Sequence, residues 1–316
     1  MVAAAAAGKT PAAILVFGGE PRALAARVCP TQIGPLIDRL SSSSYHPHVH
    51  PVITSQQVRE VDRLTTERYG IPSLVLMENA AAATARVIAA AFANEIANKS
   101  VLVLCGRGNN GGDGAATARL LAHGGANVRA ILFGRIENTK GDARTNFEAL
   151  TAVAEGSIES GKGSARLMEC ETDDTCRAAF QESLSEAPEV IVDAFFGTGL
   201  GRPLSGIFEE VAKRLNVARN APSVNPLIVS IDIPSGLNSD SAEPIGEAIQ
   251  ADITVTMTAP KIANVLAPAS NYNGRLIVAD IGSPRELIAE AKTDLFLTEE
   301  ADARRWLIET RYTAES

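Results

Sequence analysis

The sequence predicts an α/β protein with a mostly parallel sheet that is covered by helices on both faces. From residue 54 onward, short apolar runs alternate with segments of helical length, and this alternation is typical of parallel sheets. Three polar, glycine-rich segments follow predicted strands, which is where doubly wound sheets bind ligands. Apolar residues make up 46% of the 316 residues, which is enough to build a sizeable core.

The order of the predicted elements supports this fold class. A first helix is expected after Thr54, because Thr54 and Gln57 have the T-x-x-Q spacing of a capping box. Pro72 and Ser73 begin a second, largely apolar helix. Strands are predicted at residues 101–105, 128–133, 189–194, 227–231, 253–257 and 276–279. One helix is predicted after the glycine-rich turn that follows the first strand and extends through residue 123, and two more are predicted at 141–153 and 206–219. A surface loop is predicted at 156–163.

Residues 1–50 differ from the rest of the chain. They contain alanine runs, four consecutive serines and one short apolar run at residues 12–17, so we expect a poorly ordered or peripheral extension. Three of the four histidines lie in the pentapeptide HPHVH at 46–50. Alternate histidines on a strand could hold a metal, but no carboxylate or cysteine supports such a site, and a solvated loop is favoured.

The charge and the cysteines limit the possible functions. With 29 Lys and Arg against 37 Asp and Glu the formal charge is −8, which repels nucleic-acid backbones. The chain contains no uninterrupted run of 18 apolar residues, so no membrane span is predicted. Residues 1–10 lack the pattern of a secretory signal. The four cysteines are Cys29, Cys105, Cys170 and Cys176. They are too few for a disulfide scaffold, and we expect them to be reduced in a cytoplasmic protein.

The first glycine-rich segment, GRGNNGGDG at residues 106–114, joins a predicted strand to a predicted helix. It contains G-x-G-x-x-G, whose backbone N–H groups can bind an anion at a helix N-terminus. The usual dinucleotide fingerprint also needs an acid after the next strand, where this chain has Arg135. Because Asn109, Asn110 and Asp113 are polar groups that the ordinary fingerprint does not require, we favour a functional loop over a merely tight turn.

Two further polar segments follow predicted strands. Asp193 lies in an apolar run before a glycine-rich loop in which Arg202 could reach a phosphate. A buried carboxylate is costly unless it is paired or binds a cation, although Asp193 could also cap a neighbouring turn. Asp232 likewise ends an apolar strand. Two acids beside one Gly-Asn loop predict an oxygen-lined pocket for a monovalent or divalent cation.

Together these segments resemble the NAD(P)H-hydrate epimerase family. The resemblance covers residues 54–283, and five motifs in the family's order carry it: LVLMENAA (74–81), NNGGDG (109–114), DAFFGTGLGRP (193–203), DIPSGLNSD (232–240) and TMTAPK (256–261). It implies a Rossmann-like three-layer α/β/α sandwich. Because family members are often dimers, it also implies a homodimer.

The resemblance implies roles for individual residues. Asp232 matches the family's substrate-binding acid and is the candidate for acid/base catalysis, while Lys261 either stabilises charge near the substrate or pairs with an acid at the sheet edge. Asn110, Asp193 and Ser235 match the positions that hold a potassium ion, and their oxygen ligands suit K⁺ better than Zn²⁺. The substrate-binding residues that it implies are Asn109, Asn110, Gly111, Gly112, Asp113, Gly197, Thr198, Gly199, Leu200, Gly201, Arg202, Pro203 and Asp232.

The resemblance also implies a reaction. The family's substrate is NADH or NADPH hydrated at C6 of the nicotinamide ring, and the enzyme interconverts the R and S epimers so that a dehydratase specific for S can restore the whole pool. Two routes are open. In one, water leaves and returns through a nitrogen-stabilised cation; in the other, the ring opens and closes. Arg135, in place of a ribose-binding acid, is compatible with a 2′-phosphate on the substrate.

Two other functions compete with this interpretation. The same fold serves as a non-catalytic binding or scaffold module in a messenger-RNA decapping factor and an apolipoprotein-binding protein, but the presence of all four residues Asn110, Asp193, Asp232 and Ser235 favours the enzyme. An ordinary Rossmann dehydrogenase would need a proton-relay group, and His123 is the only histidine outside residues 1–50.

The sequence divides into the extension (1–50), an epimerase domain (51–284) and a tail (285–316). A helix is predicted at residues 285–291, and LFLTEEADARRWL (295–307) resembles the connector that leads into the kinase-like dehydratase domain of bifunctional family members. We therefore expect the chain to be the epimerase half of a longer bifunctional protein. The alternative is a tail that packs on its own domain as an extra helix.

Overall fold

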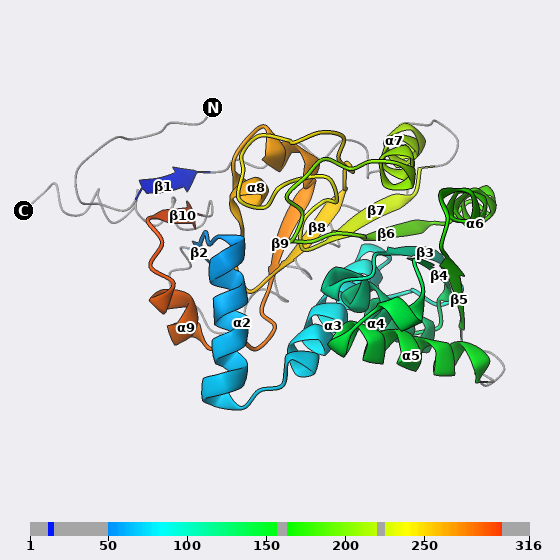
Figure 1. Ribbon diagram of the computed structural model, residues 1–316, viewed down its shortest axis with the longest axis horizontal. Helices are drawn as coiled ribbons and strands as arrows, with labels where there is room; N and C mark the ends of the chain where they lie inside the picture. The colour runs from blue at the N-terminus through cyan, green and yellow to red at the C-terminus, as the bar shows by residue number, and fades with distance from the viewer. Residues whose placement is uncertain (1–11, 16–49, 157–162, 220–224, 299–316) are drawn as a thin grey trace, which may run out of the picture.

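A seven-stranded parallel sheet forms the centre of the computed structural model, which describes residues 12–15, 50–156, 163–219 and 225–298 (Figure 1). In chain order the strands are β3 (Ser100–Cys105), β4 (Asn127–Phe133), β5 (Ser164–Cys170), β6 (Val190–Ala194), β7 (Leu227–Ile231), β8 (Ile253–Met257) and β9 (Arg275–Ala279). Their order in the sheet is β5-β4-β3-β6-β7-β8-β9. The chain therefore reverses its direction of travel between β3 and β6, the position at which such sheets bind ligands.

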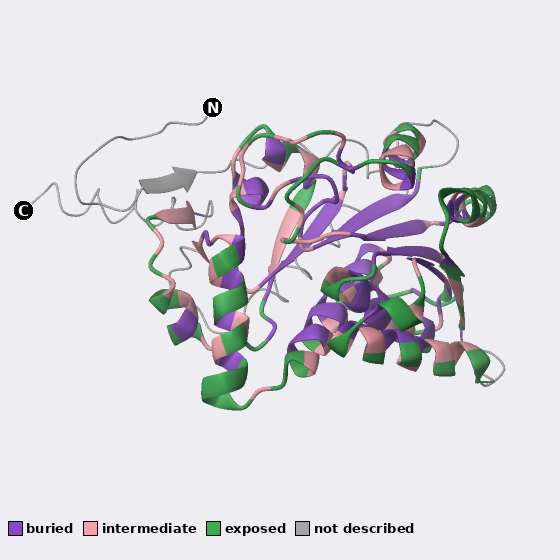
Figure 2. Cartoon of the chain, in the orientation of Figure 1, coloured by how far each residue is buried: buried purple, intermediate pink, exposed green. Residues whose placement is uncertain are grey.

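Helices cover both faces of this sheet (Figure 1). One face carries α3 (Ser73–Ala91), α4 (Asn109–His123) and α5 (Gly141–Glu155), and the other carries α6 (Asp173–Ser185) and α7 (Ile207–Arg219). Figure 2 shows the central strands as buried ribbon between these layers. The predicted α/β fold class and its three layers are confirmed.

Apolar runs form the central strands because both faces of each strand are covered. In β3, Val101 and Val103 contact the core beneath α3, α4 and α5, while Leu102 and Leu104 contact the core on the opposite face. A strand with this environment has no polar side, so its sequence is continuously hydrophobic. This is why β3, β6, β7 and β8 could be predicted from apolar runs alone.

The predicted capping box is present at the start of α2 (Ser55–Tyr69). The Thr54 side chain accepts a hydrogen bond from the backbone N–H of Gln57, and the Gln57 side chain accepts one from the backbone N–H of Thr54. Ser55 is anchored as well, because its backbone N–H and its Oγ both donate to the carboxylate of Asp240. These contacts fix α2 against the loop that follows β7.

The apolar helix α3 is long and hydrophobic enough to cross a membrane by length and composition alone. In the structure its side chains are used in packing instead. Leu76, Ala80, Val87 and Ile88 belong to the buried cluster beneath the sheet. The apolar character of α3 is therefore explained by its place in the core.

The elements that the sequence analysis missed include one strand and one helix of the central layers. The edge strand β5 reads SARLMEC, and its alternating exposed and half-buried residues include Arg166 and Glu169, so it lacks the apolar run of a central strand. The helix α6 follows it after the capping residue Thr172. The loop predicted at residues 156–163 lies largely outside the described residues.

A smaller sheet joins parts of the extension and the tail. Its order is β1 (Ala12–Leu15), β10 (Leu295–Thr298) and β2 (His50–Pro51). The helix predicted at 285–291 is present as α9 (Arg285–Glu290). Residues 1–11, 16–49 and 299–316, and with them His46 and His48 of the HPHVH segment, lie outside the described residues.

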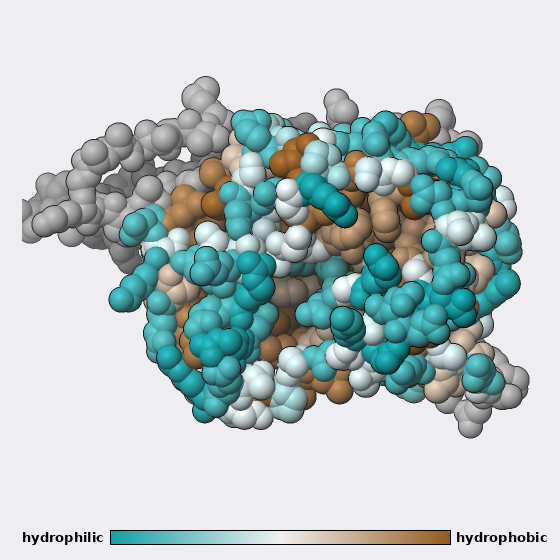
Figure 3. Space-filling model, in the orientation of Figure 1, coloured by the Kyte–Doolittle hydropathy of each residue, from teal (hydrophilic) through white to brown (hydrophobic). Residues whose placement is uncertain are grey.

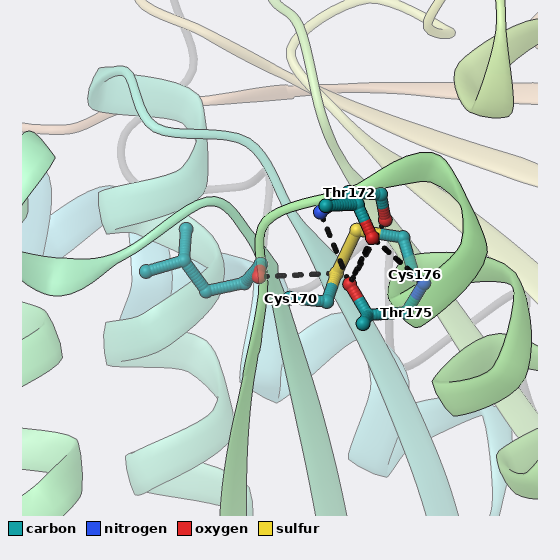
Figure 4. The surroundings of a disulfide bond; sticks show 5 residues. Cys170, Thr172, Thr175 and Cys176 are labelled. Carbon is teal, nitrogen blue, oxygen red and sulfur yellow. Dashed lines mark hydrogen bonds between the residues drawn. A yellow bond between two sulfur atoms is a disulfide. The ribbon is translucent and has the colours of Figure 1, made fainter.

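Cys170 and Cys176 form a disulfide that joins the end of β5 to the first turn of α6 (Figure 4). The expectation of reduced cysteines is therefore wrong for this pair. The two residues are only six positions apart, and the turn between strand and helix brings their Cα atoms to 4.9 Å, within the range of disulfides. Cys105 is a free, buried thiol.

Helix α4 lies so close to the sheet that Gly114 has no room for a side chain. A Cβ there would lie 2.5 Å from the Cβ of Ala194 and 2.9 Å from the Sγ of Cys105. We expect Gly114→Ala to lower the free energy of unfolding by about 1–3 kcal/mol, the usual cost of overpacking, as measured by urea denaturation. Gly201→Ala, where a Cβ meets nothing within 4 Å, should change it little. Equal stability of the two variants would contradict this packing.

Candidate functional site

Asp193 lies at the carboxyl end of β6, fully buried and surrounded by neutral donors. The strand register places it beside Ser230 of β7, whose Oγ donates to Asp193 Oδ2 at 2.8 Å. The Ser235 backbone N–H donates to the same oxygen at 2.8 Å, and the Ser235 Oγ donates to Oδ1 at 2.6 Å. Asp193 therefore caps the turn after β7, the structural role considered for it above.

The charge of Asp193 has no cationic partner among the described residues. Burial raises the pKa of its carboxyl group, and the hydrogen bonds from Ser235 and Ser230 oppose that rise. An anion at such a place is stabilised only by dipoles. A weakly charged cation close to Asp193 would therefore be favoured electrostatically.

The second acid, Asp232, is partly buried and forms an ion pair with a buried lysine. Its Oδ1 lies 2.6 Å from the Nζ of Lys261, whose side chain is 0% exposed. Lys261 also donates to Thr256 Oγ1 at 2.8 Å and to the Met257 carbonyl at 2.9 Å. Of the two roles considered for Lys261, the structure shows the pairing with an acid, and that acid is the candidate catalytic residue Asp232.

Local backbone geometry orients Asp232. Its φ of 68° lies in the left-handed region, which is rare for residues other than glycine and concentrates at functional sites. The Thr198 backbone N–H donates to Asp232 Oδ2 at 3.0 Å. Lys261 therefore holds one carboxylate oxygen, while the glycine-rich loop after β6 holds the other.

Gly197 allows three loops to meet at this point. A Cβ on Gly197 would lie 2.7 Å from Asp232 Oδ2 and 3.2 Å from Asn110 Oδ1, so only glycine fits between them. Asn110 comes from the first turn of α4, and its Nδ2 is buried without a hydrogen-bond partner. The structure thus places a polar amide, a carboxylate and a backbone loop side by side at the carboxyl edge of the sheet.

The other residues implied by the resemblance differ in their exposure. Asn109, Gly199, Gly201, Arg202 and Pro203 are exposed. Leu200 packs on the apolar cluster beneath α7, Gly111 and Gly112 are buried at the start of α4, and Asp113 is half-buried. Of the three residues implied for potassium, Ser235 contacts Asp193, whereas Asn110 lies beside Gly197.

Sequence reasoning missed three polar residues of the site. Thr256 contacts both Lys261 and Asp232, and Asn264 accepts hydrogen bonds from Thr256 Oγ1 and from the Lys261 backbone N–H. Asp62 lies on α2, and its Oδ1 is buried without a hydrogen-bond partner. The signal for Asp62 was a charged residue among the buried positions Val58, Val61 and Thr65 of one helix face.

Two of the carboxyl groups bind protons more tightly than usual. Burial, with a contribution from the negative charge of Asp232, raises the pKa of Asp62 to about 6, although the charge of Lys261 acts in the opposite direction. Burial and the charges of Asp232 and Asp62 raise the pKa of Asp113 well above its ordinary value. Asp62, Asp113 and Asp232 thus form a cluster of interacting carboxyl groups in which Asp62 and Asp113 have raised pKa values, as groups at sites of acid/base chemistry do.

Arg135 is already paired with acids. Its guanidinium lies 3.4 Å from a carboxylate oxygen of Glu137 and 3.4 Å from one of Glu171, at an exposed position. These ion pairs compete with the 2′-phosphate considered for Arg135. Among the described residues there is no group of three or more His, Cys, Asp or Glu side chains that could hold a metal ion.

Comparison with known proteins shows which family the chain is similar to. The family model described as YjeF-related protein N-terminus matches residues 73–263. The bifunctional NAD(P)H-hydrate repair enzyme Nnr of Moorella thermoacetica is 37% identical over 238 residues, which are 75% of this chain and 42% of that protein. The NAD(P)H-hydrate epimerase of Limosilactobacillus fermentum is 36% identical over 72% of this chain and 95% of its own length.

A solved structure shows the same fold. The crystal structure of yeast ynu0 superposes with a TM-score of 0.59 at 25% sequence identity and covers 78% of this chain and 99% of the yeast chain. This chain spans less than half the length of the bifunctional relative but nearly all of the single-function one. The chain therefore belongs to the family of the YjeF-related protein N-terminus, together with NAD(P)H-hydrate epimerases and bifunctional repair enzymes.

Proposed function

We propose that the protein is an NAD(P)H-hydrate epimerase, an isomerase that interconverts the R and S epimers of NADH or NADPH hydrated at C6 of the nicotinamide ring. Its family membership supports this activity, since relatives named for it match across nearly their whole length. The observation that carries the proposal is the Asp232–Lys261 pair at the strand ends, beside carboxyl groups that retain protons. No observation favours the scaffold module.

The chemistry of the substrate explains why such a site suits it. In the dehydration route a proton is added to the C6 hydroxyl, the C–O bond breaks with its electron pair on the departing water, and the ring nitrogen stabilises the cation. Water then returns to the other face and releases a proton. In the ring-opening route the hydroxyl loses its proton as C6 becomes an aldehyde, and the ring nitrogen takes the electron pair and a proton. Both routes need one group that gives and recovers a proton.

The loops around Asp232 provide the means to bind a dinucleotide. We propose that residues 109–113 and 197–203 hold the substrate, with the N-terminus of α4 facing its phosphates, because the first backbone N–H groups of a helix attract anions. Asn110 and Thr198 would then lie near the reacting ring, since both are close to Asp232.

A potassium ion fits the residues proposed to hold it. The carboxylate of Asp193 is buried and lacks a cationic partner among the described residues, and Ser235 and Asn110 offer neutral oxygens. Such an oxygen set suits a large monovalent ion. When bound, K⁺ would supply positive charge that compensates Asp193 and tightens the loops after β6 and β7.

Further proposals concern the surroundings of the enzyme. We propose residues 51–284 as the catalytic domain, residues 1–50 as a peripheral extension and residues 285–316 as a connector to a dehydratase domain. Several relatives are named as bifunctional repair enzymes, which supports this division. We also propose that the protein is a homodimer in the cytoplasm, without nucleic-acid or membrane partners.

A coupled assay tests the function: with an S-specific dehydratase present, this protein should accelerate consumption of the R epimer.

Asp232→Asn tests the catalytic role of Asp232. The amide retains the size of the side chain but loses both its negative charge and its capacity for proton exchange, so turnover should fall about 10²–10⁴-fold whether Asp232 moves the proton or stabilises positive charge on the substrate, with little change in the Kd for the substrate by calorimetry. Asp280→Asn replaces an exposed aspartate that follows the edge strand β9 and should keep normal turnover. Near-normal turnover of Asp232→Asn would show that Asp232 only positions the substrate.

A thermal-melting series tests the cation site. Replacing sodium with potassium at constant ionic strength should raise the Tm of the wild-type protein, because K⁺ binds only the folded state. Asp193→Asn should abolish the difference between the two salts, whereas Asp280→Asn should preserve it. Identical melting of the wild type in both salts would contradict potassium binding.

A further inference from the structure

We propose that Asp62 is a second catalytic carboxyl group of this site and carries the proton that is exchanged with the substrate, while Asp232 is held by Lys261 as the fixed anion beside it. This inference rests on the proposed function and assigns the proton transfer to a residue of α2 that lies outside the five motifs. Three observations support it.

The first observation is the docking of α2. Val58 packs on Ala259 together with Ile53, and the Ile53 backbone N–H donates to the Pro260 carbonyl at 3.0 Å. These contacts place the start of α2 directly beside the residues that precede Lys261. Since side chains four positions apart share one face of a helix, Asp62 continues the face of Val58 toward the ion pair.

The second observation is the state of the Asp62 carboxyl group. Its Oδ1 is buried and accepts no hydrogen bond, an arrangement that costs stability unless a ligand or water completes it. The acids of the neighbouring turns are used otherwise: Glu60 pairs with Arg63, and Glu67 pairs with the same arginine on the exposed side. Of these acidic residues of α2, Asp62 is the one on the buried face.

The third observation is the electrostatic environment. The charged groups that act on Asp62 are Lys261 and Asp232, and Asp62 in turn acts on Asp113 of α4. The two acids of α9 have other partners on α2: Glu290 pairs with Arg68, and Glu286 accepts a hydrogen bond from the Tyr69 hydroxyl. With its pKa raised to about 6, Asp62 can both give and take a proton near neutral pH.

Figure 3 shows a recess beside α2 on the face presented there. Because the charge of Asp232 acts on Asp62, a substrate whose ring lies against Asp232 would also come near Asp62. In the dehydration route, Asp62 protonates the C6 hydroxyl, water leaves with the C–O electron pair, and Asp62 recovers the proton from the water that adds to the other face of the cation.

A pH–rate profile tests the assignment. The kcat/KM for R-to-S conversion of hydrated NADH, followed by proton NMR between pH 5 and 9, should show a limb near pH 6 in the wild type. Asp62→Asn should lose at least about 10²-fold in kcat and lose this limb, with KM changed less than about threefold. Asp62→Glu should restore part of the rate together with the limb, because it returns a carboxyl group.

A control on the same helix separates catalysis from packing. Glu60→Gln removes an exposed acid two positions away and should keep both the rate and the limb. A wild type that does not interconvert the epimers would refute the proposed function. An active wild type whose profile is retained in Asp62→Asn, or lost equally in Glu60→Gln, would refute only the role of Asp62.

Protein stability gives a second readout that needs no substrate. The pKa of Asp62 is raised in the folded state, so ionisation of Asp62 weakens folding once the pH exceeds the ordinary pKa of an aspartate. Asp62→Asn should therefore have a higher Tm than the wild type at pH 8, and this advantage should shrink as the pH falls through 6 toward 4. A lower Tm of the variant at pH 8 would show a structural role and overturn the proposal.

Discussion

The ion pair between Asp232 and the buried Lys261 determines the arrangement of the whole site. Removing two charges from water is costly, and a buried pair is tolerated only when further hydrogen bonds satisfy both groups. Here Thr256 and the Met257 carbonyl satisfy Lys261, and the Thr198 backbone N–H satisfies the free oxygen of Asp232. Removing one partner of such a pair typically costs about 3–5 kcal/mol. The loops after β6, β7 and β8 are therefore coupled through one interaction.

The remaining polar groups acquire their properties from this pair. The positive charge of Lys261 compensates one negative charge, which is that of Asp232. Asp62 and Asp113 then ionise in a partly buried place where the nearby anion opposes them. Asp193 lies deeper, at the end of β6, where serine and backbone donors stabilise it without a counter-ion among the described residues. One set of strand ends and the helices beside it thus hold three kinds of acid: Asp232 paired with a lysine, Asp62 and Asp113 with raised pKa values, and the buried Asp193, which suits a cation.

The sequence predicted the central sheet because its strands are buried on both faces and hence continuously apolar. It could not reveal β5, where Arg166 and Glu169 face solvent at the sheet edge, nor the disulfide of Cys170 and Cys176, which depends on how the chain turns from β5 into α6. Asp232 was found because an acid directly after an apolar strand is unusual.

Asp62 was not assigned to the site, because its role depends on which helix face docks beside Lys261. That information lies in tertiary packing, through the contacts of Ile53 and Val58 with the end of β8. The partner of Lys261 was likewise open from the sequence, since spacing along the chain does not tell which of several acids a lysine reaches. The sequence thus shows which residue types are present, but only the folded structure shows which of them contact one another.

The most direct test of the proposed function is the approach to equilibrium from both sides, without a dehydratase. Purified R and purified S epimers of hydrated NADH, each mixed with a catalytic amount of the protein, should converge on the same ratio, and proton NMR should show no other product. Epimers that each persist at the uncatalysed rate would contradict the assignment of epimerase activity to the Asp232–Lys261 site.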